Sequence, residues 1–283
     1  MFPGQASYSM VRTAAWRAAH QILDRPRIFE DAVAVGLVPE ASEQAIRDNA
    51  DDHSSPVHVL LRALFAFRSR FTEERLAQAA ARGVRQYVIV GAGLDTFPWR
   101  QPAFAKDMRI FFVDHPSTLA WSTERFRERG LPTPPNLTFV AADLEAQDLA
   151  ARLDEHGFER ATPTFCSVLG VTQYISRNAT EALLRFAASL PAQSEIVFTF
   201  SPPDDEMDSD ELAATVWSLA ATAATGEPWL TRLRAPELSS LLTSLGFREI
   251  FHLTRERAQE RYFSGRTDTL KANRLEELFA ATV

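Results

Sequence analysis

The chain has 283 residues, and its 30 basic and 37 acidic side chains give a net charge of -7, which argues against a nucleic-acid partner. Hydrophobic residues make up 46% of the sequence, enough for a full core, and no apolar run is long enough to cross a bilayer. The start, MFPGQASYSMVRTAAW, lacks the pattern of a signal peptide, so we expect a cytoplasmic protein without a membrane partner. A single cysteine, Cys166, leaves no internal disulfide and no cysteine metal cluster, and we expect no metal.

The first 83 residues are predicted to be helical. One helix ends near Pro26, and a longer one runs from Pro56 to about Gly83. We therefore expect residues 1–83 to form a helical extension that acts as a lid. Residues 84–283 would form the main domain, with both parts in one structural unit.

Short apolar runs alternate with helical segments after Gly83. The runs are apolar throughout, as in strands that are covered on both faces. They are Tyr87–Val90, Ile110–Val113, Thr138–Ala141, Phe165–Leu169 and Ile196–Phe200. Helices are predicted between them at Ser117–Arg129, Leu149–His156 and Ala179–Leu190. This order predicts an α/β fold with a parallel, doubly wound sheet.

The C-terminal part has a different order of predicted elements. Helices are expected at 210–225 and 236–245, strands at 249–253 and 261–263, and a final helix near 273–280. The polar stretch SPPDDEMDSDEL, residues 201 to 212, is predicted as a loop and a helix start, with a functional acidic loop as the alternative.

Two glycines end the first predicted strand, in QYVIVGAGLDTFPWR. Gly91 and Gly93 allow a tight turn, and they also let a ligand approach the backbone closely. Asp95 follows at once, Asp114 ends the second predicted strand, and Asp143 ends the third. One such aspartate is consistent with a helix cap, whereas three at one sheet edge favour a bound ligand.

The residues at the three strand ends indicate a nucleoside ligand. Asp114 is placed to accept both ribose hydroxyls, as the acidic residue of dinucleotide folds does. Asp143 is placed to accept from an adenine amino group, with Leu144 packed on the ring. Thr96 stands where the dinucleotide motif has its third glycine, which favours a ligand without phosphate, such as S-adenosylmethionine. A nicotinamide-dependent oxidoreductase is the principal alternative.

An arginine interrupts an apolar helical stripe in PVHVLLRALFAFRSRFTEERL. Leu61, Leu64, Arg68 and Phe71 share one face of this helix, whereas Arg70 lies nearly opposite. A buried guanidinium needs an anion, so Arg68 either forms an internal ion pair or binds the carboxylate of the methionine moiety.

Four segments occur in family-like order and spacing: VIVGAGLDTFPWR, FFVDHP, FVAADLE and LGVTQYIS. They resemble the leucine carboxyl methyltransferase family, within it the bacterial S-adenosylmethionine-dependent O-methyltransferases associated with natural-product pathways. RTAAWRAAHQILDRPRIFEDAVA resembles the helical entry of that family, and the likeness covers residues 8–205. It implies a Rossmann-like sheet of seven strands, mostly parallel, with an antiparallel strand near the end.

The resemblance implies a set of cofactor-binding residues. These are Arg68, Gly91, Ala92, Gly93, Asp95, Asp114, His115, Asp143, Leu144 and Leu169. Arg70 is close enough to Arg68 to leave the carboxylate ligand open, and Arg12 is a candidate for a second one. Phe97 stands where family members often have arginine. Leu169 stands where the branch that methylates a protein phosphatase has glutamate; this loss, with no obvious protein-partner surface in the sequence, makes a protein C-terminus a weaker expectation than a small molecule.

The methyl acceptor is less well defined than the cofactor. Methyl transfer from a sulfonium is a direct displacement that mainly requires alignment, and a carboxylate acceptor needs no base. Gln173, Tyr174 and His115 are candidates for catalysis, and Arg17 and His20 lie on the expected lid. We predict O-methylation of a small molecule that carries a carboxylate or a hydroxyl. A non-catalytic cofactor-binding protein is a further alternative, and the oligomeric state stays open.

Overall fold

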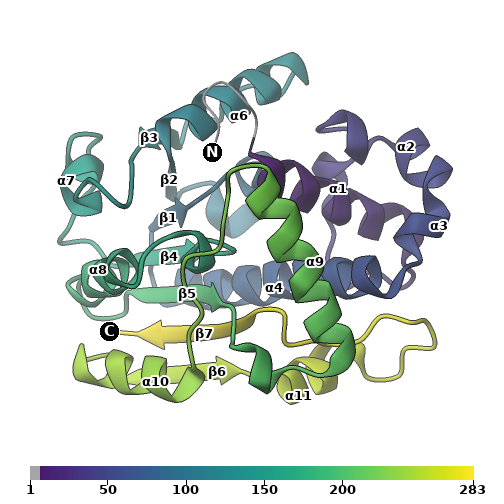
Figure 1. Ribbon diagram of the computed structural model, residues 1–283. Helices are drawn as coiled ribbons and strands as arrows, with labels where there is room; N and C mark the ends of the chain where they lie inside the picture. Colours follow the sequence, from purple (N-terminus) through teal and green to yellow (C-terminus); the bar gives the residue numbers. More distant parts are fainter. Residues whose placement is uncertain (1–6) are drawn as a thin grey trace.

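The computed structural model describes residues 7–283, which fold around a single seven-stranded sheet (Figure 1). The strand order is β3-β2-β1-β4-β5-β7-β6, with β7 antiparallel to both of its neighbours and the first five strands parallel. The strands are β1 (Gln86–Val90), β2 (Arg109–Asp114), β3 (Leu137–Ala141), β4 (Thr164–Val168), β5 (Glu195–Phe200), β6 (Glu249–Leu253) and β7 (Glu277–Thr282). This is the expected Rossmann-like methyltransferase sheet.

The register of the parallel strands brings their carboxyl ends to one edge. Val90 of β1 lies beside Val113 of β2 and Val168 of β4, and Asp114 lies beside Ala141 of β3. The residues that follow these four strands therefore share one side of the molecule, where ligands bind in open parallel sheets.

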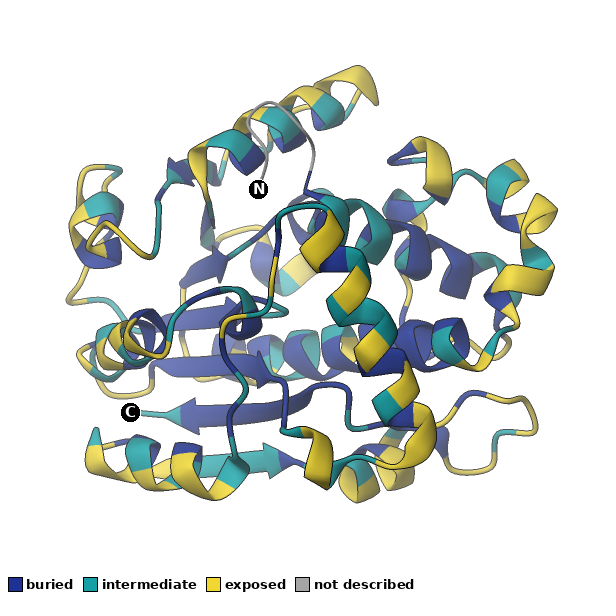
Figure 2. Ribbon diagram, in the orientation of Figure 1, coloured by how far each residue is buried: buried dark blue, intermediate teal, exposed yellow. Residues whose placement is uncertain are grey.

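Helices cover both faces of the sheet; the strands β1, β4, β5 and β7 are almost fully buried, whereas β3 and β6 at the two edges are partly exposed (Figure 2). One core contains side chains of α1 (Tyr8–Leu23), α4 (Pro56–Ala81) and α6 (Pro116–Glu128), and the other contains side chains of α7 (Leu149–Asp154), α8 (Arg177–Ala188) and α10 (Ala235–Ser244). The remaining helices are α2 (Glu43–Asp48), α3 (Ala50–His53), α5 (Phe97–Arg100), α9 (Ser209–Ala224) and α11 (Arg255–Ala258). No helix in residues 7–283 has both the length and the apolar character needed to cross a membrane.

The helices before residue 84 share a core with the sheet. Leu64 and Phe67 of α4 belong to the same buried cluster as Ile89 of β1. Near its end, α4 is also tied to β5, because Arg75 and Arg82 bind the two carboxylate oxygens of Glu195 at 2.5 and 2.6 Å. These helices pack directly on the strands. The division of the chain into two parts at residue 83 therefore stays a prediction.

Two predicted C-terminal elements are wrong. Residues 273–280, expected as a helix, contribute to strand β7, whose residues are buried between β5 and β6. Residues 261–263, expected as a strand, lie in a π-helical turn, Gln259–Phe263, where the Tyr262 hydroxyl donates to Glu74 of α4 at 2.8 Å. In both cases packing against distant elements overrides the local preference.

Candidate cofactor and acceptor site

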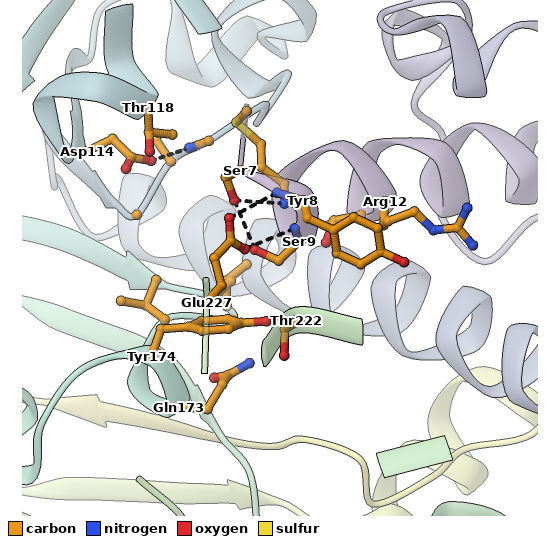
Figure 3. A pocket seen from close by; sticks show the side chains of 18 of the residues that line it. Ser7, Tyr8, Ser9, Arg12, Asp114, Thr118, Gln173, Tyr174, Thr222 and Glu227 are labelled. Atoms are coloured by element: carbon orange, nitrogen blue, oxygen red, sulfur yellow. Dashed lines mark hydrogen bonds between the residues drawn. The ribbon is translucent and has the colours of Figure 1, made fainter. Parts of the chain in front are cut away.

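A pocket of about 500 Å³ lies at the carboxyl ends of β1 to β4, and residues of α1, α4, α9 and the loop 226–230 complete its wall. Asp114 and Gln173 lie at well-separated positions around it in the close view, and α1 enters from another direction (Figure 3). The volume is within the range of small-molecule and cofactor sites. All ten residues expected to bind the cofactor line this one pocket.

The turn after β1 requires its two glycines. Gly91 and Gly93 have φ angles of 64° and 53°, in the left-handed region that side chains disfavour. A Cβ on Gly91 would lie 2.2 Å from Cγ2 of Val171, and one on Gly93 would lie 3.1 Å from Cγ of Met10. The glycines thus let Val171 and Met10 pack directly on the turn, and the Ala92 N–H holds the turn to β2 by donating to the Val113 carbonyl at 3.1 Å.

Thr96 has a structural role that explains why it replaces a glycine. Its hydroxyl donates to Oδ1 of buried Asp31 at 2.7 Å and accepts from Nε of Arg100 at 2.8 Å. Arg17 of α1 binds the same Asp31 at 3.2 Å and donates to the Leu94 carbonyl at 2.5 Å. This network fixes the turn to the N-terminal helices. Asp31 was not predicted as a site residue, although it stands in the family-like segment DRPRIFEDAVA.

Asp95 lies at the pocket but also stabilises the turn from within. Its Oδ1 accepts from the Phe97 N–H at 2.7 Å, at the start of α5. The remaining carboxylate oxygen is the part of Asp95 that a ligand would meet.

Asp114, which is predicted to bind ribose, is held in place by the backbone. Its two oxygens accept from the backbone N–H groups of Gly93 at 2.6 Å and His115 at 2.7 Å, which fixes the carboxylate at the pocket (Figure 3). Burial raises the pKa of Asp114 to about 6, against the opposing effect of these two hydrogen bonds. His115 lines the pocket as the N-cap of α6, with Nδ1 2.8 Å from the Ser117 hydroxyl.

Asp143 and Leu144 follow β3 and line the end of the pocket beyond Asp114. Oδ1 of Asp143 accepts from the Glu145 N–H at 3.0 Å, which turns the chain and exposes Leu144 to the pocket. The arrangement fits an adenine with its amino group at the carboxylate and its ring on the leucine.

Arg68 and Arg70 are clearly separated by the structure. Arg68 is buried at the pocket, where Nη1 binds Oε2 of Glu276 at 2.7 Å and the guanidinium lies 4.3 Å from the Phe65 ring centroid. Arg70 is half-exposed and binds Glu74 at 2.5 Å, away from the pocket lining. Of the two arginines, only Arg68 is placed to meet a cofactor carboxylate.

The LGVTQY segment after β4 is shaped around Arg68. Gly170 has a φ of 70°, and a Cβ there would lie 3.0 Å from Nη1 of Arg68. Its N–H donates to the Thr199 hydroxyl at 2.7 Å, which holds the segment against β5. Leu169, just before it, also lines the pocket.

The part of the pocket between α1 and α9 is rich in aromatic rings. Arg12 lies over the Trp16 ring at 4.8 Å and within 6.0 Å of the Trp217 ring centroid. Its Nε atom is buried without a hydrogen-bond partner, and Nη2 is 3.5 Å from Nε2 of His58. Arg12 has no carboxylate partner among the described residues, and burial lowers the pKa of His58. This region of the pocket therefore combines apolar rings with a cationic side chain.

The candidates for catalysis have different environments. Burial raises the pKa of Tyr174 to about 12, so its hydroxyl is protonated at neutral pH and acts as a donor. Gln173 lies beside it in the pocket wall. His20 of α1 does not line the pocket, because its ring is buried between Asp24, at 2.8 Å, and the Ile28 N–H, at 3.0 Å.

Three further site residues lie beyond the family-like region and were missed. Glu227 accepts from the N–H groups of Tyr8 and Ser9, at 2.9 and 3.1 Å, and so holds the start of α1 over the pocket (Figure 3). Trp217 and Glu276 complete the wall. The sequence carries no clear signal for Glu276, because Arg274 and Glu277 beside it give the segment the look of a polar helix face.

The leucine carboxyl methyltransferase model matches residues 10–188. The chain belongs to this family. A Bacillus subtilis (strain 168) protein named "Putative S-adenosyl-L-methionine-dependent methyltransferase YktD" is 29% identical over 293 residues, with 96% of each chain covered. A Mycobacterium avium (strain 104) protein named as a methyltransferase of the same cofactor class is 30% identical over 71% of this chain and 66% of its own length.

Solved structures support the fold. A DUF574 family protein from Streptomyces avermitilis aligns with a TM-score of 0.61 at 17% identity, with 99% of this chain and 98% of that one covered. A Thermobifida fusca protein described as a methyltransferase aligns with a TM-score of 0.55 at 16% identity, with 95% and 93% covered. These comparisons confirm the predicted family, the predicted methyltransferase class and the predicted sheet. The cofactor prediction agrees with the names of the sequence relatives.

The residues present fit S-adenosylmethionine. The pocket passes the glycine turn, where the methionine moiety could lie, the carboxylate of Asp114 could accept from ribose hydroxyls, and Asp143 and Leu144 suit adenine. When bound, the cofactor would supply a methyl group on a sulfonium, from which the neutral thioether is a good leaving group. The chain's own residues need to bind the cofactor and the acceptor, orient them for transfer, and exclude water.

Proposed function

We propose that this S-adenosylmethionine-dependent methyltransferase of the leucine carboxyl methyltransferase family methylates an oxygen of a small, largely apolar acceptor of the natural-product type. The observation that supports this proposal is that the residues predicted to bind a nucleoside and a group of aromatic side chains line one and the same pocket. The acceptor would enter between α1 and α9 and meet the methyl group near Tyr174. A cytoplasmic location and the absence of a nucleic-acid or membrane partner remain predictions.

A carboxylate acceptor suits this pocket better than a hydroxyl. Arg12, without a carboxylate partner among the described residues, attracts an anion, and the surrounding rings strengthen that attraction by excluding water. A carboxylate also needs no base, whereas a hydroxyl acceptor would need one. The raised pKa of Tyr174 makes that residue a poor base at neutral pH.

Two measurements test the proposal in sequence. S-adenosylhomocysteine should raise the melting temperature and NAD should not, because Thr96 and the bulky turn leave no pyrophosphate site. Stabilisation by NAD alone would favour a nicotinamide-dependent oxidoreductase instead.

The second measurement follows radiolabelled methyl from S-adenosylmethionine into matched pairs of aryl carboxylic acids and phenols. A methyl ester releases methanol in mild base, whereas a methyl ether does not, so the product class is read directly. Binding of the cofactor without transfer to either series would favour a non-catalytic cofactor-binding protein.

A further inference from the structure

A buried polar cluster in the pocket wall joins three elements distant in sequence. It consists of Arg68 of α4, Gln173 of the 3-10 turn Thr172–Tyr174, and Glu276, which directly precedes β7. All three line the pocket, and their exposed fractions are 7%, 2% and 5%. Glu276 lies outside the residues that match the family model, 10–188.

The hydrogen bonds within this cluster leave one acceptor unused. Oε2 of Glu276 accepts from Nη1 of Arg68 at 2.7 Å, and Oε1 accepts from Nε2 of Gln173 at 3.1 Å. This second bond turns the amide so that Oε1 of Gln173 is its free end, and that atom is buried without a hydrogen-bond partner. A buried acceptor in this position is costly unless a ligand supplies a donor.

The charges of the cluster indicate which donor it receives. Arg68 provides a cation for a carboxylate, whereas Glu276 and Gln173 provide acceptors directly beside it. An α-amino acid carries a carboxylate and an ammonium on one carbon, so its zwitterion matches this arrangement of opposite charges. A ligand with a carboxylate alone would bring a second negative charge close to Glu276, with no positive charge of its own to offset the repulsion.

Resting on the proposed use of S-adenosylmethionine, we infer that Glu276 and Gln173 bind the ammonium group of the cofactor's methionine moiety while Arg68 binds its carboxylate. The cluster then does more than neutralise Arg68. It selects ligands that carry the amino group. When the cofactor binds, its ammonium group donates to the free oxygen of Gln173.

Isothermal titration calorimetry with three ligands tests this inference. S-adenosylhomocysteine has the complete zwitterion, its deaminated analogue keeps only the carboxylate, and 5′-methylthioadenosine lacks the amino-acid end. The wild-type protein should bind the deaminated analogue at least about tenfold more weakly than S-adenosylhomocysteine, the scale of one hydrogen-bonded charge. If S-adenosylhomocysteine itself does not bind, the proposed function fails rather than this inference.

Glu276→Gln removes the charge and keeps the shape of the side chain. We expect it to weaken S-adenosylhomocysteine about tenfold and to leave the deaminated analogue unchanged or tighter, so that the preference for the amino group is lost. Gln173→Met, which removes the free oxygen, should reduce the same preference. Binding of 5′-methylthioadenosine, unchanged in both variants, verifies that the rest of the site is intact.

Glu227→Gln is the matched control, because Glu227 is the other buried carboxylate of the pocket that binds a distant segment, here the start of α1. It should change S-adenosylhomocysteine and the deaminated analogue by the same factor. The inference is overturned if Glu276→Gln also weakens the two ligands equally, because Glu276 would then act only by holding Arg68. It is overturned as well if the wild-type protein shows no preference for the amino group.

Discussion

The carboxylate of Asp114 has a structural role in the turn and is also the group predicted to bind ribose. Two backbone N–H groups hold it at the pocket, while burial raises its pKa from 3.8 to about 6. Between these two pH values the folded protein binds more protons than the unfolded chain. The contribution of Asp114 to the stability of the free protein therefore falls as pH rises through this window. Ribose hydroxyls, in contrast, donate to the charged form.

We expect ligand affinity to follow the charge of Asp114. Titration with 5′-methylthioadenosine, which keeps the ribose and lacks the amino-acid end, should give a dissociation constant that is flat above about pH 7 and rises below pH 6, by up to about tenfold per unit. Asp114→Asn should weaken binding at pH 8 by about 1–3 kcal/mol and remove most of this pH dependence. The same rise at low pH in Asp114→Asn would show that another group titrates.

The conformation of the turn between β1 and α5 depends on a side chain that is distant in the sequence. Gly91 has both a left-handed φ and a neighbour, Val171, that occupies the place of its missing Cβ. Gly83 also has a positive φ, 102°, but nothing lies within 4 Å of its Cβ position. Comparing substitutions at Gly91 and Gly83 therefore separates the cost of backbone strain from the cost of steric overlap.

Gly91→Ala should lower the free energy of unfolding by more than Gly83→Ala. The control should cost about 1–2 kcal/mol from backbone strain, and Gly91→Ala about 1–3 kcal/mol more from overlap with Val171. Val171→Ala should recover part of the second loss but none of the first, which urea denaturation of the two single variants and the double variant would measure. Strict additivity of the two changes would rule out the contact.

Local signals in the sequence located most elements of the sheet and the cofactor half of the site. The buried runs that became β1 to β5, and the residues at their carboxyl ends, carry a pattern that requires no knowledge of distant contacts. NRLEELFAATV misled because Leu275, Leu278 and Phe279 have helical spacing, while the segment becomes a strand by inserting between β5 and β6. Glu276 and Glu227 were missed for the same reason, since their partners are 208 and 219 residues away.

On the scale of the whole molecule, the pocket joins the N-terminal helices to the C-terminal segment. Glu227 holds the start of α1, Glu276 holds Arg68 of α4, and Glu195 binds two arginines at the end of the N-terminal helices. The segment that the family model leaves unmatched thus supplies carboxylates that anchor the helices before residue 84. These contacts predict that residues 1–83 and 84–283 unfold together.

Thermal unfolding should therefore be a single transition that all parts of the chain share. Circular dichroism, which reports the helices and the sheet, should give the same midpoint as the fluorescence of the five tryptophans, of which Trp16 is on α1 and Trp99 on α5. S-adenosylhomocysteine at about 100 times its dissociation constant adds about 2.7 kcal/mol, which should raise both midpoints together by about 5 °C for a chain of this size. Two transitions, of which the ligand shifted only one, would mean that the helical extension is a separate cooperative unit and that the pocket does not couple it to the sheet.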